Sequence, residues 1–271
     1  MPQRLVELNI DLTRPGFYDE PAFVEAEKAD PRLLNAYAAH VRELPLDEGY
    51  LRYARDRVTE SSAFLFEKLK QDGRKGACVD VSQVLMRFLE RQGVWSYMVK
   101  GAVTLIFPDS TIPEYHFYWE TGQRSNAVAP HMWLTAPPFK IVDLTLGLQE
   151  YEHGEGRFLG EPFVLDSPAT TRVQLTDLVH PDVVDEMRVG LRRKPLLADV
   201  PRYSDLLTRM KALGMWQVER PGVVVKYFGY AVSAPDGEFE NAANLILGSK
   251  RPFELWTEFV KLRNPPTGYN R

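Results

Sequence analysis

The hydrophobic pattern changes its period at Gly93, and this change constrains the fold more than any other feature of the chain. Before Gly93, apolar residues recur at the spacing of one helix face, namely Val81, Val84, Leu85, Phe88 and Leu89. After Gly93, residues 95–107 are rich in Val, Tyr, Ile and Phe, which is typical of a strand, with Gly101 at a bend or bulge. We therefore expect a helix that packs on a sheet.

Further strand patterns follow at residues 115–120, 131–135 and 140–146, the last two joined at Pro137-Pro138. One helix followed by a run of antiparallel strands is an α+β arrangement. A long amphipathic helix is predicted over residues 47–70, ahead of the helix that begins near residue 78.

The flanking regions carry weaker patterns. Residues 1–20 alternate as a strand does, and residues 21–45 are helical in two pieces. Towards the C-terminus, a capped helix is expected at 204–214, two hairpin strands at 223–232 and 239–247, and a final helix at 253–263. We divide the chain into an N-terminal extension (1–45), a core domain (46–165) and a C-terminal α/β extension (166–271), which packs on the core or forms a separate unit.

Composition narrows the class of protein. An apolar fraction of 44% and a charged fraction of 26% are ordinary for a globular domain, and a formal net charge of −4 argues against nucleic acid as the main partner. The chain shows no secretory signal pattern and no long apolar span, so we expect no membrane partner. Its single cysteine excludes an internal disulfide and fits a reducing compartment, so we expect a cytoplasmic protein. The sequence does not indicate an oligomeric state.

That single cysteine, Cys78, lies at the predicted start of the helix, and His131 and Asp143 follow on strand patterns. A thiol at a helix N-terminus, then a His, then an Asp, is the chain order of a Cys-His-Asp acyl-transfer site. The helix N-terminus stabilises the thiolate, the His exchanges protons with it, and the Asp holds the imidazole ring. A lone buried cysteine is common, so the prediction depends on all three residues together.

The triad requires a particular connection between the two strands that carry His131 and Asp143. His131 and Asp143 must project from the same face of neighbouring strands. A two-residue turn at Pro137-Pro138 is not expected, because the favoured types need positive φ angles. A loop of three or five residues centred on Pro137 brings His131 opposite Asp143, whereas an even loop without a bulge separates them.

These residues resemble the transglutaminase-like superfamily over about residues 46–150. The resemblance is carried by Gly76-Ala77-Cys78, Gly93-Val94, Gly101, His131-Met132-Trp133 and Asp143-Leu144-Thr145. It implies a papain-like fold in which the nucleophile helix packs on an antiparallel sheet, with Cys78 as nucleophile, His131 as base and Asp143 as the group that orients it. The chain departs from the family pattern at Trp95, Met132, Phe139 and Leu144.

Two groups of residues could be written as metal sites, but neither has the spacing of a known hydrolytic zinc motif. They are Glu114 and His116 with His131, and Glu152 and His153 with Glu155. We expect no metal and no cofactor.

The expected activity is cysteine-dependent cleavage or transfer of an acyl group from a protein, peptide or small amide substrate. Protease or amidase and transglutaminase or deamidase reactions both remain open. The alternatives are a non-catalytic protein-binding module on the same fold and a small-molecule N-acyltransferase.

Overall fold

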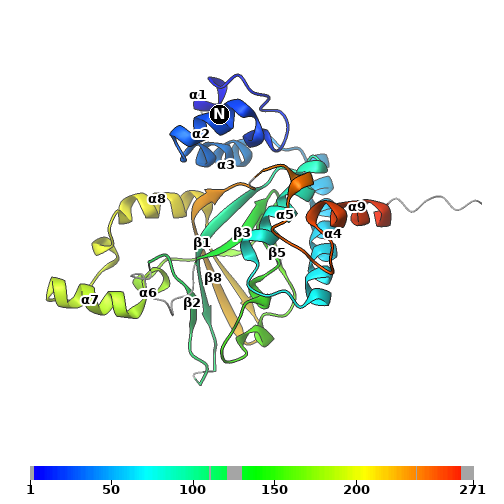
Figure 1. Cartoon of the computed structure of the whole chain (residues 1–271). Coiled ribbons are helices and arrows are strands. Elements are labelled where there is room, and N and C mark those ends of the chain that lie inside the picture. The colour runs from blue at the N-terminus through cyan, green and yellow to red at the C-terminus, as the bar shows by residue number, and fades with distance from the viewer. Residues whose placement is uncertain (1–2, 110, 121–129, 236, 264–271) are drawn as a thin grey trace, which may run out of the picture.

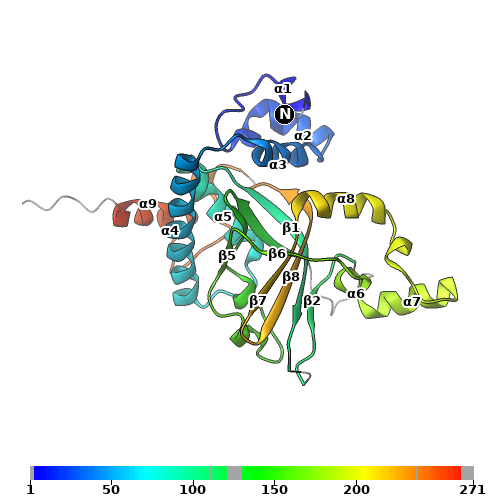
Figure 2. The same ribbon diagram turned by 180° about the vertical axis from the view of Figure 1, so that it is seen from behind.

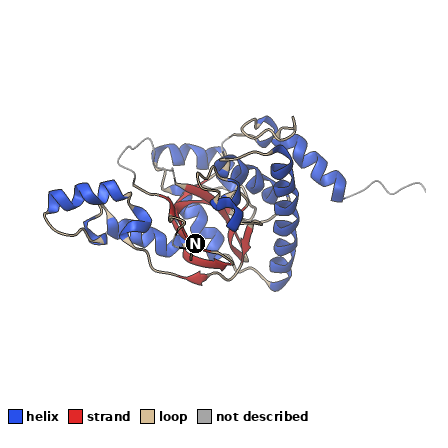
Figure 3. Ribbon diagram, turned by 90° about the horizontal axis from the view of Figure 1, so that it is seen from below, coloured by secondary structure: helices blue, strands red, loops and turns tan. Residues whose placement is uncertain are grey.

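The computed structural model describes residues 3–109, 111–120, 130–235 and 237–263. Its centre is a single curled sheet (Figure 3), in which every strand pairing within these residues is antiparallel. The strand order is β5-β4-β3-β1-β8-β7-β6, and β2 pairs with β1. The strands are β1 (Tyr97–Ile106), β2 (Tyr115–Phe117), β3 (His131–Ala136), β4 (Phe139–Asp143), β5 (Phe163–Leu165), β6 (Ala169–Thr170), β7 (Met215–Arg220) and β8 (Val223–Ser233). The α+β class expected from the sequence is thus correct.

Helices surround this sheet (Figures 1 and 2). They are α1 (Gln3–Val6), α2 (Pro21–Ala29), α3 (Leu33–Glu43), α4 (Glu48–Asp72), α5 (Cys78–Arg91), α6 (Leu175–Leu178), α7 (Pro181–Leu191), α8 (Tyr203–Leu213) and α9 (Pro252–Arg263). The long helix predicted at 47–70 is α4. It starts where the Asp47 carboxylate accepts the Tyr50 N–H at 2.7 Å, and it ends at Gly73, whose φ of 71° is left-handed.

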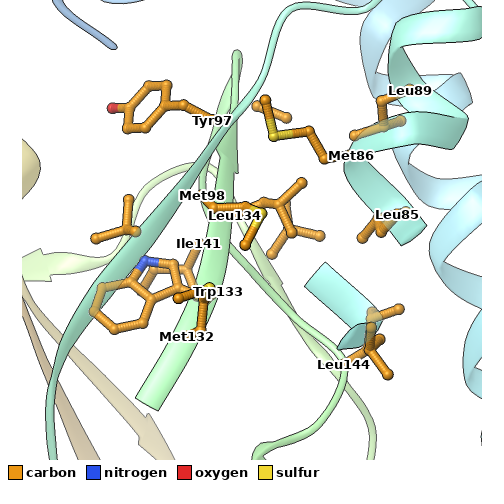
Figure 4. Close-up of a cluster of buried hydrophobic side chains, with 14 of the residues drawn as sticks. Leu85, Met86, Leu89, Tyr97, Met98, Met132, Trp133, Leu134, Ile141 and Leu144 are labelled. Carbon is orange, nitrogen blue, oxygen red and sulfur yellow. The ribbon is translucent and has the colours of Figure 1, made fainter. Parts of the chain in front are cut away.

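The predicted helix stripe of α5 faces the sheet. Leu85, Met86 and Leu89 point towards Met98 and Leu134 (Figure 4), and all five are at most 1% exposed. Full burial of each such side chain stabilises the fold by about 1.5–3 kcal/mol. This packing fixes α5, and with it residue 78, against β3. A second apolar cluster, which includes Leu206, Met210 and Phe228, lies between α8 and the sheet.

Two expected strands are wrong. In the described residues 3–20 the structure has the short helix α1 and a 3-10 turn at Phe17–Asp19. Leu5, Phe17 and Tyr18 are buried from these helical turns, and the sheet contains no strand from this segment. Residues 239–247 contain a 3-10 turn, Phe239–Asn241, and no strand. The hairpin partner of β8 is β7, and since β1 occupies its other side, β8 has no free edge for a further strand.

Residues from all three expected segments share one core. Strand β8, from segment 166–271, pairs with β1 of segment 46–165. Leu5, Leu85 and Phe259 belong to one cluster of buried side chains. In the described ranges, no helix has the length and apolar character needed to cross a bilayer.

Candidate active site

Cys78 is the first residue of α5, as its pattern predicts. Ala77 is the N-cap residue and forms no side-chain cap hydrogen bond to the first turn of α5. The Gly76 N–H donates to the carbonyl of Leu148 at 3.1 Å, which ties the loop before Cys78 to the segment after β4. The thiol is half-buried. The nucleophile candidate is therefore held beside the end of β4, at the N-terminus of a helix.

The β3–β4 connection differs from the one expected. It is a two-residue turn with a cis Pro137-Pro138 peptide, and the register shifts between Leu134 and Ala136. Proline in cis is compatible with a tight turn without positive φ, a type that the expectation overlooked. The register shift restores the shared face: Leu134 pairs with Val142, so His131 and Asp143 are diagonal neighbours on one side of the sheet.

His131 and Asp143 are directly bonded. The imidazole Nε2 lies 2.8 Å from Asp143 Oδ2, and both side chains are 0% exposed. Because a carboxylate only accepts, Nε2 carries the proton, and in the neutral ring Nδ1 is left as the base. His131 Nδ1 is buried and has no partner of hydrogen-bonding geometry among the described residues. The sequence prediction that these two residues meet is correct.

The Asp143 carboxylate is surrounded by donors. Its Oδ1 accepts the backbone N–H groups of Thr145 (2.9 Å) and Leu146 (3.1 Å) and the Thr145 hydroxyl (3.2 Å), and Oδ2 accepts the Tyr227 hydroxyl at 3.1 Å. Burial raises the pKa of Asp143, but the charge of His131 and these bonds outweigh it and lower the pKa. Asp143 is therefore ionised although it is buried.

The thiol and the imidazole are coupled. Burial disfavours a charged imidazole, but Asp143 and the Cys78 sulfur favour it more, so the pKa of His131 is raised. Burial likewise opposes the thiolate, but interaction with His131 and with the Met132 N–H lowers the pKa of Cys78. The two groups thus interact, although His131 Nδ1 has no partner of strict hydrogen-bonding geometry among the described residues.

Aromatic side chains fix the imidazole ring. Phe117 contacts it at 5.0 Å between ring centres, and Trp133 stacks on it at 6.5 Å. Trp133 fits because residue 101, which pairs with His131 across the ladder, is glycine: a Cβ there would lie 2.3 Å from the indole. The strand glycine of the sequence pattern thus makes room for the ring that supports His131.

The two rejected metal groups do not gather around the triad. His116 lies 3.3 Å from Glu114 and 3.2 Å from the Thr104 hydroxyl. Successive side chains of a strand point to opposite faces, and the next residue, Phe117, contacts His131, so His116 points to the other face of the sheet. Glu155 accepts the His153 N–H at 2.9 Å. Within the described ranges, no three His, Cys, Asp or Glu side chains form an arrangement suited to a metal ion.

Sequence reasoning missed Tyr227, whose hydroxyl reaches Asp143 from β8. The two residues are 84 positions apart, and only the sheet order, with β8 beside β1, brings them together. Thr145 was visible as the last residue of the Asp-Leu-Thr motif, but its role as a donor to Asp143 was not. No protein-family model matches the chain, and searches of curated proteins and of solved structures also find no match.

Proposed function

We propose that this protein is a cysteine-dependent acyl-transfer enzyme of the transglutaminase-like type, with a papain-like core formed by α5 and the antiparallel sheet. One observation carries the proposal: His131 binds Asp143 through Nε2, and its buried Nδ1 has no hydrogen-bond partner among the described residues. We assign this nitrogen to the Cys78 thiol. A purely structural histidine is expected to satisfy both ring nitrogens when fully buried. The mutual effect of Cys78 and His131 on their pKa values supports the same pairing.

The first half-reaction forms a thioester. The Cys78 thiolate attacks the carbonyl carbon of an amide, and the carbon–oxygen double bond opens to an oxyanion. The Cys78 N–H, at the helix start, is a natural donor to this oxyanion. When the double bond re-forms, the carbon–nitrogen bond breaks and the imidazolium of His131 gives its proton to the leaving amine.

The second half-reaction releases the acyl group. Water or an amine gives a proton to the now neutral His131 and attacks the thioester, and the thiolate leaves. Water yields an acid, so the enzyme acts as a protease, amidase or deamidase; an amine yields a new amide. We favour hydrolysis, because water is always present. Asp143 stays ionised throughout and holds the ring.

The test is capture of the acyl-enzyme. Wild type is compared with Cys78→Ala, His131→Gln and Asp143→Asn, with His153→Gln as the matched control, because His153 is an exposed histidine outside the triad. Acyl donors are glutamine-containing peptides and the activated ester p-nitrophenyl acetate. Products are followed as released ammonia, cleaved peptide and incorporated dansylcadaverine, and mass spectrometry of the digested protein locates the acyl group.

We expect acylation of Cys78 and turnover in wild type and His153→Gln. Turnover falls at least about 100-fold in His131→Gln and Asp143→Asn, the loss typical of a missing acid–base group. Turnover that survives Cys78→Ala contradicts the proposal. So does the absence of any acyl-enzyme from a thiol that alkylating reagents reach, and that result favours the non-catalytic binding role.

A further inference from the structure

A cavity of about 510 Å³ lies at the turn end of the β3–β4 hairpin. It opens between the α3–α4 connection, the Pro137-Pro138 turn and the end of α8. Since β3 begins at His131 and ends at Ala136, the cavity is roughly 17 Å along this strand from His131. Its volume is that of a small-molecule site.

The walls of this cavity are apolar and aromatic. Tyr97, Phe139 and Trp216 line it from three different strands. Tyr97 and Phe139 are 1% and 5% exposed. The Trp216 ring lies so close to Gly214 that a Cβ on that residue would meet the indole nitrogen at 2.0 Å. The surrounding structure thus holds these rings in position, and Trp216 is the one of the three that is partly exposed.

Its charged groups are all positive. Arg42, Lys140 and Lys211 line the cavity, and no Asp or Glu is among the described residues that do so. The Arg42 guanidinium lies over Tyr97, 5.9 Å from the ring centre. Neither Lys140 nor Lys211 has a carboxylate within 4.0 Å in the described part of the chain.

Other cavities of similar size are different. The cavity of about 440 Å³ beside Glu90 is lined by three arginines and five acidic residues, and that of about 410 Å³ beside Phe66 by one arginine and two glutamates. Both of those cavities carry charges of both signs, with the acidic residues in excess. Three cations around one apolar cavity repel each other unless an anion joins them.

We propose that the cavity at the Pro137-Pro138 turn is a second binding site, for a small organic anion with an aromatic body. The ring system of the ligand lies against Trp216, the partly exposed ring of the three, and its carboxylate or sulfonate lies among Arg42, Lys140 and Lys211. The anionic group neutralises the like charges, while the aromatic body fills the apolar part. This site does not depend on the activity proposed for Cys78.

The test uses three probes of one shape: naphthalene-2-sulfonate, the neutral 2-naphthalenemethanol and the cationic 2-naphthylmethylammonium. Binding to the full chain is measured by isothermal titration calorimetry. Lys140→Glu/Lys211→Glu reverses two charges at the cavity, and Lys194→Glu/Lys261→Glu is the control with the same change in net charge on exposed residues elsewhere. Ala212→Trp narrows the cavity without changing its charge. The urea midpoint of each variant verifies folding.

We expect saturable binding of the sulfonate with a Kd below about 1 mM, the weaker end of specific affinities. Binding of the alcohol is weaker, and binding of the ammonium is absent. The affinity for the sulfonate falls at least about tenfold in Lys140→Glu/Lys211→Glu and in Ala212→Trp, and less than about twofold in the control. Equal binding of all three probes, no saturable binding by the sulfonate, or unchanged affinity in both cavity variants overturns the proposal.

Discussion

Replacement of Gly101 by Ala tests how the sheet supports His131. The new Cβ would lie 2.3 Å from Cη2 of Trp133 and 2.5 Å from the carbonyl oxygen of Phe228. Trp133 and Phe228 are both fully buried, and the oxygen belongs to the main chain of β8, which pairs with β1. Neither neighbour is the free end of a flexible side chain, so the strands themselves must move.

Overpacked cores lose about 1–3 kcal/mol, and two such contacts at a central strand put Gly101→Ala near the upper value. A loss of about 3 kcal/mol lowers the folding equilibrium constant about 100-fold, and it lowers the Tm by roughly 6–12 °C for a chain of this size. Because residue 101 pairs with His131, we also expect slower alkylation of Cys78 at neutral pH.

The assay is urea unfolding, with Gly190→Ala as the control. Gly190 lies in α7, where a Cβ meets no atom within 4 Å, so alanine there should stabilise the helix by up to about 1 kcal/mol. In a Trp133→Phe background, Gly101→Ala should lower the free energy of unfolding by a smaller amount, because the contact with the indole is gone. The loss should not be zero, because the contact with the Phe228 oxygen remains. If the free energy of unfolding of Gly101→Ala lies within about 0.5 kcal/mol of the wild-type value, this account of the sheet packing is refuted.

Three further predictions concern buried ionisable groups. Asp143→Asn should lower the rate of Cys78 acylation at least about 100-fold with native far-UV circular dichroism, because the ring loses the anion that fixes its tautomer; an unchanged rate contradicts the triad. Tyr227→Phe should lower the free energy of unfolding in urea by about 1.5–3 kcal/mol, because the Asp143 carboxylate loses the hydrogen bond from the Tyr227 hydroxyl. The ionised Asp143 contributes to the free energy of unfolding above its unfolded pKa, and this contribution is lost as the pH falls through the lowered pKa of the folded state. Without the Tyr227 hydroxyl the folded pKa of Asp143 is lowered less, so acid unfolding should begin at a higher pH. An unchanged acid midpoint counts against the bond. Burial raises the pKa of Glu90 to about 7, although Arg87 and Tyr18 lie beside it. The folded wild type therefore binds more protons than the unfolded chain, and its stability should fall as the pH rises from about 4.5 to 7. The urea midpoint should fall less over this range in Glu90→Gln, and an equal fall in both proteins would contradict the prediction.

The elements nearest the triad could be predicted because their residues carry local signals. The stripe from Val81 to Leu89 has a helical period and ends in a glycine, and Cys78 precedes it by less than one turn. The β-rich run after Gly93 likewise identifies β1. For these segments local propensity and burial favour the same structure.

The flanks could not be predicted in the same way, because their structure depends on distant partners. Residues 239–247 have a strand-like composition, but Leu245 and Leu247 are buried in the core that contains α5, and Asn244 bonds to Gln83 of that helix at 2.7 Å. Strand β7 was missed because polar residues such as Gln217 and Glu219 interrupt its pattern; its place is set by pairing with β8.

In the candidate site, too, local signals could be read from the sequence and long-range contacts could not. Cys78, His131 and Asp143 were recognisable by chemistry and order, whereas the turn that aligns them was not. The bulge between Leu134 and Ala136, which compensates for the even turn, has no clear signal in the residues themselves. Tyr227 became visible only with the sheet order.

The most direct test of the central claim is the pH dependence of iodoacetamide alkylation of Cys78 in wild type and in His131→Ala, with His153→Ala as control. A thiolate–imidazolium pair predicts an apparent pKa well below the ordinary thiol value of about 8.5 in wild type and His153→Ala, and a higher value when His131 is lost. A slow reaction with an unperturbed pKa in all three proteins would contradict the pairing of Cys78 with His131.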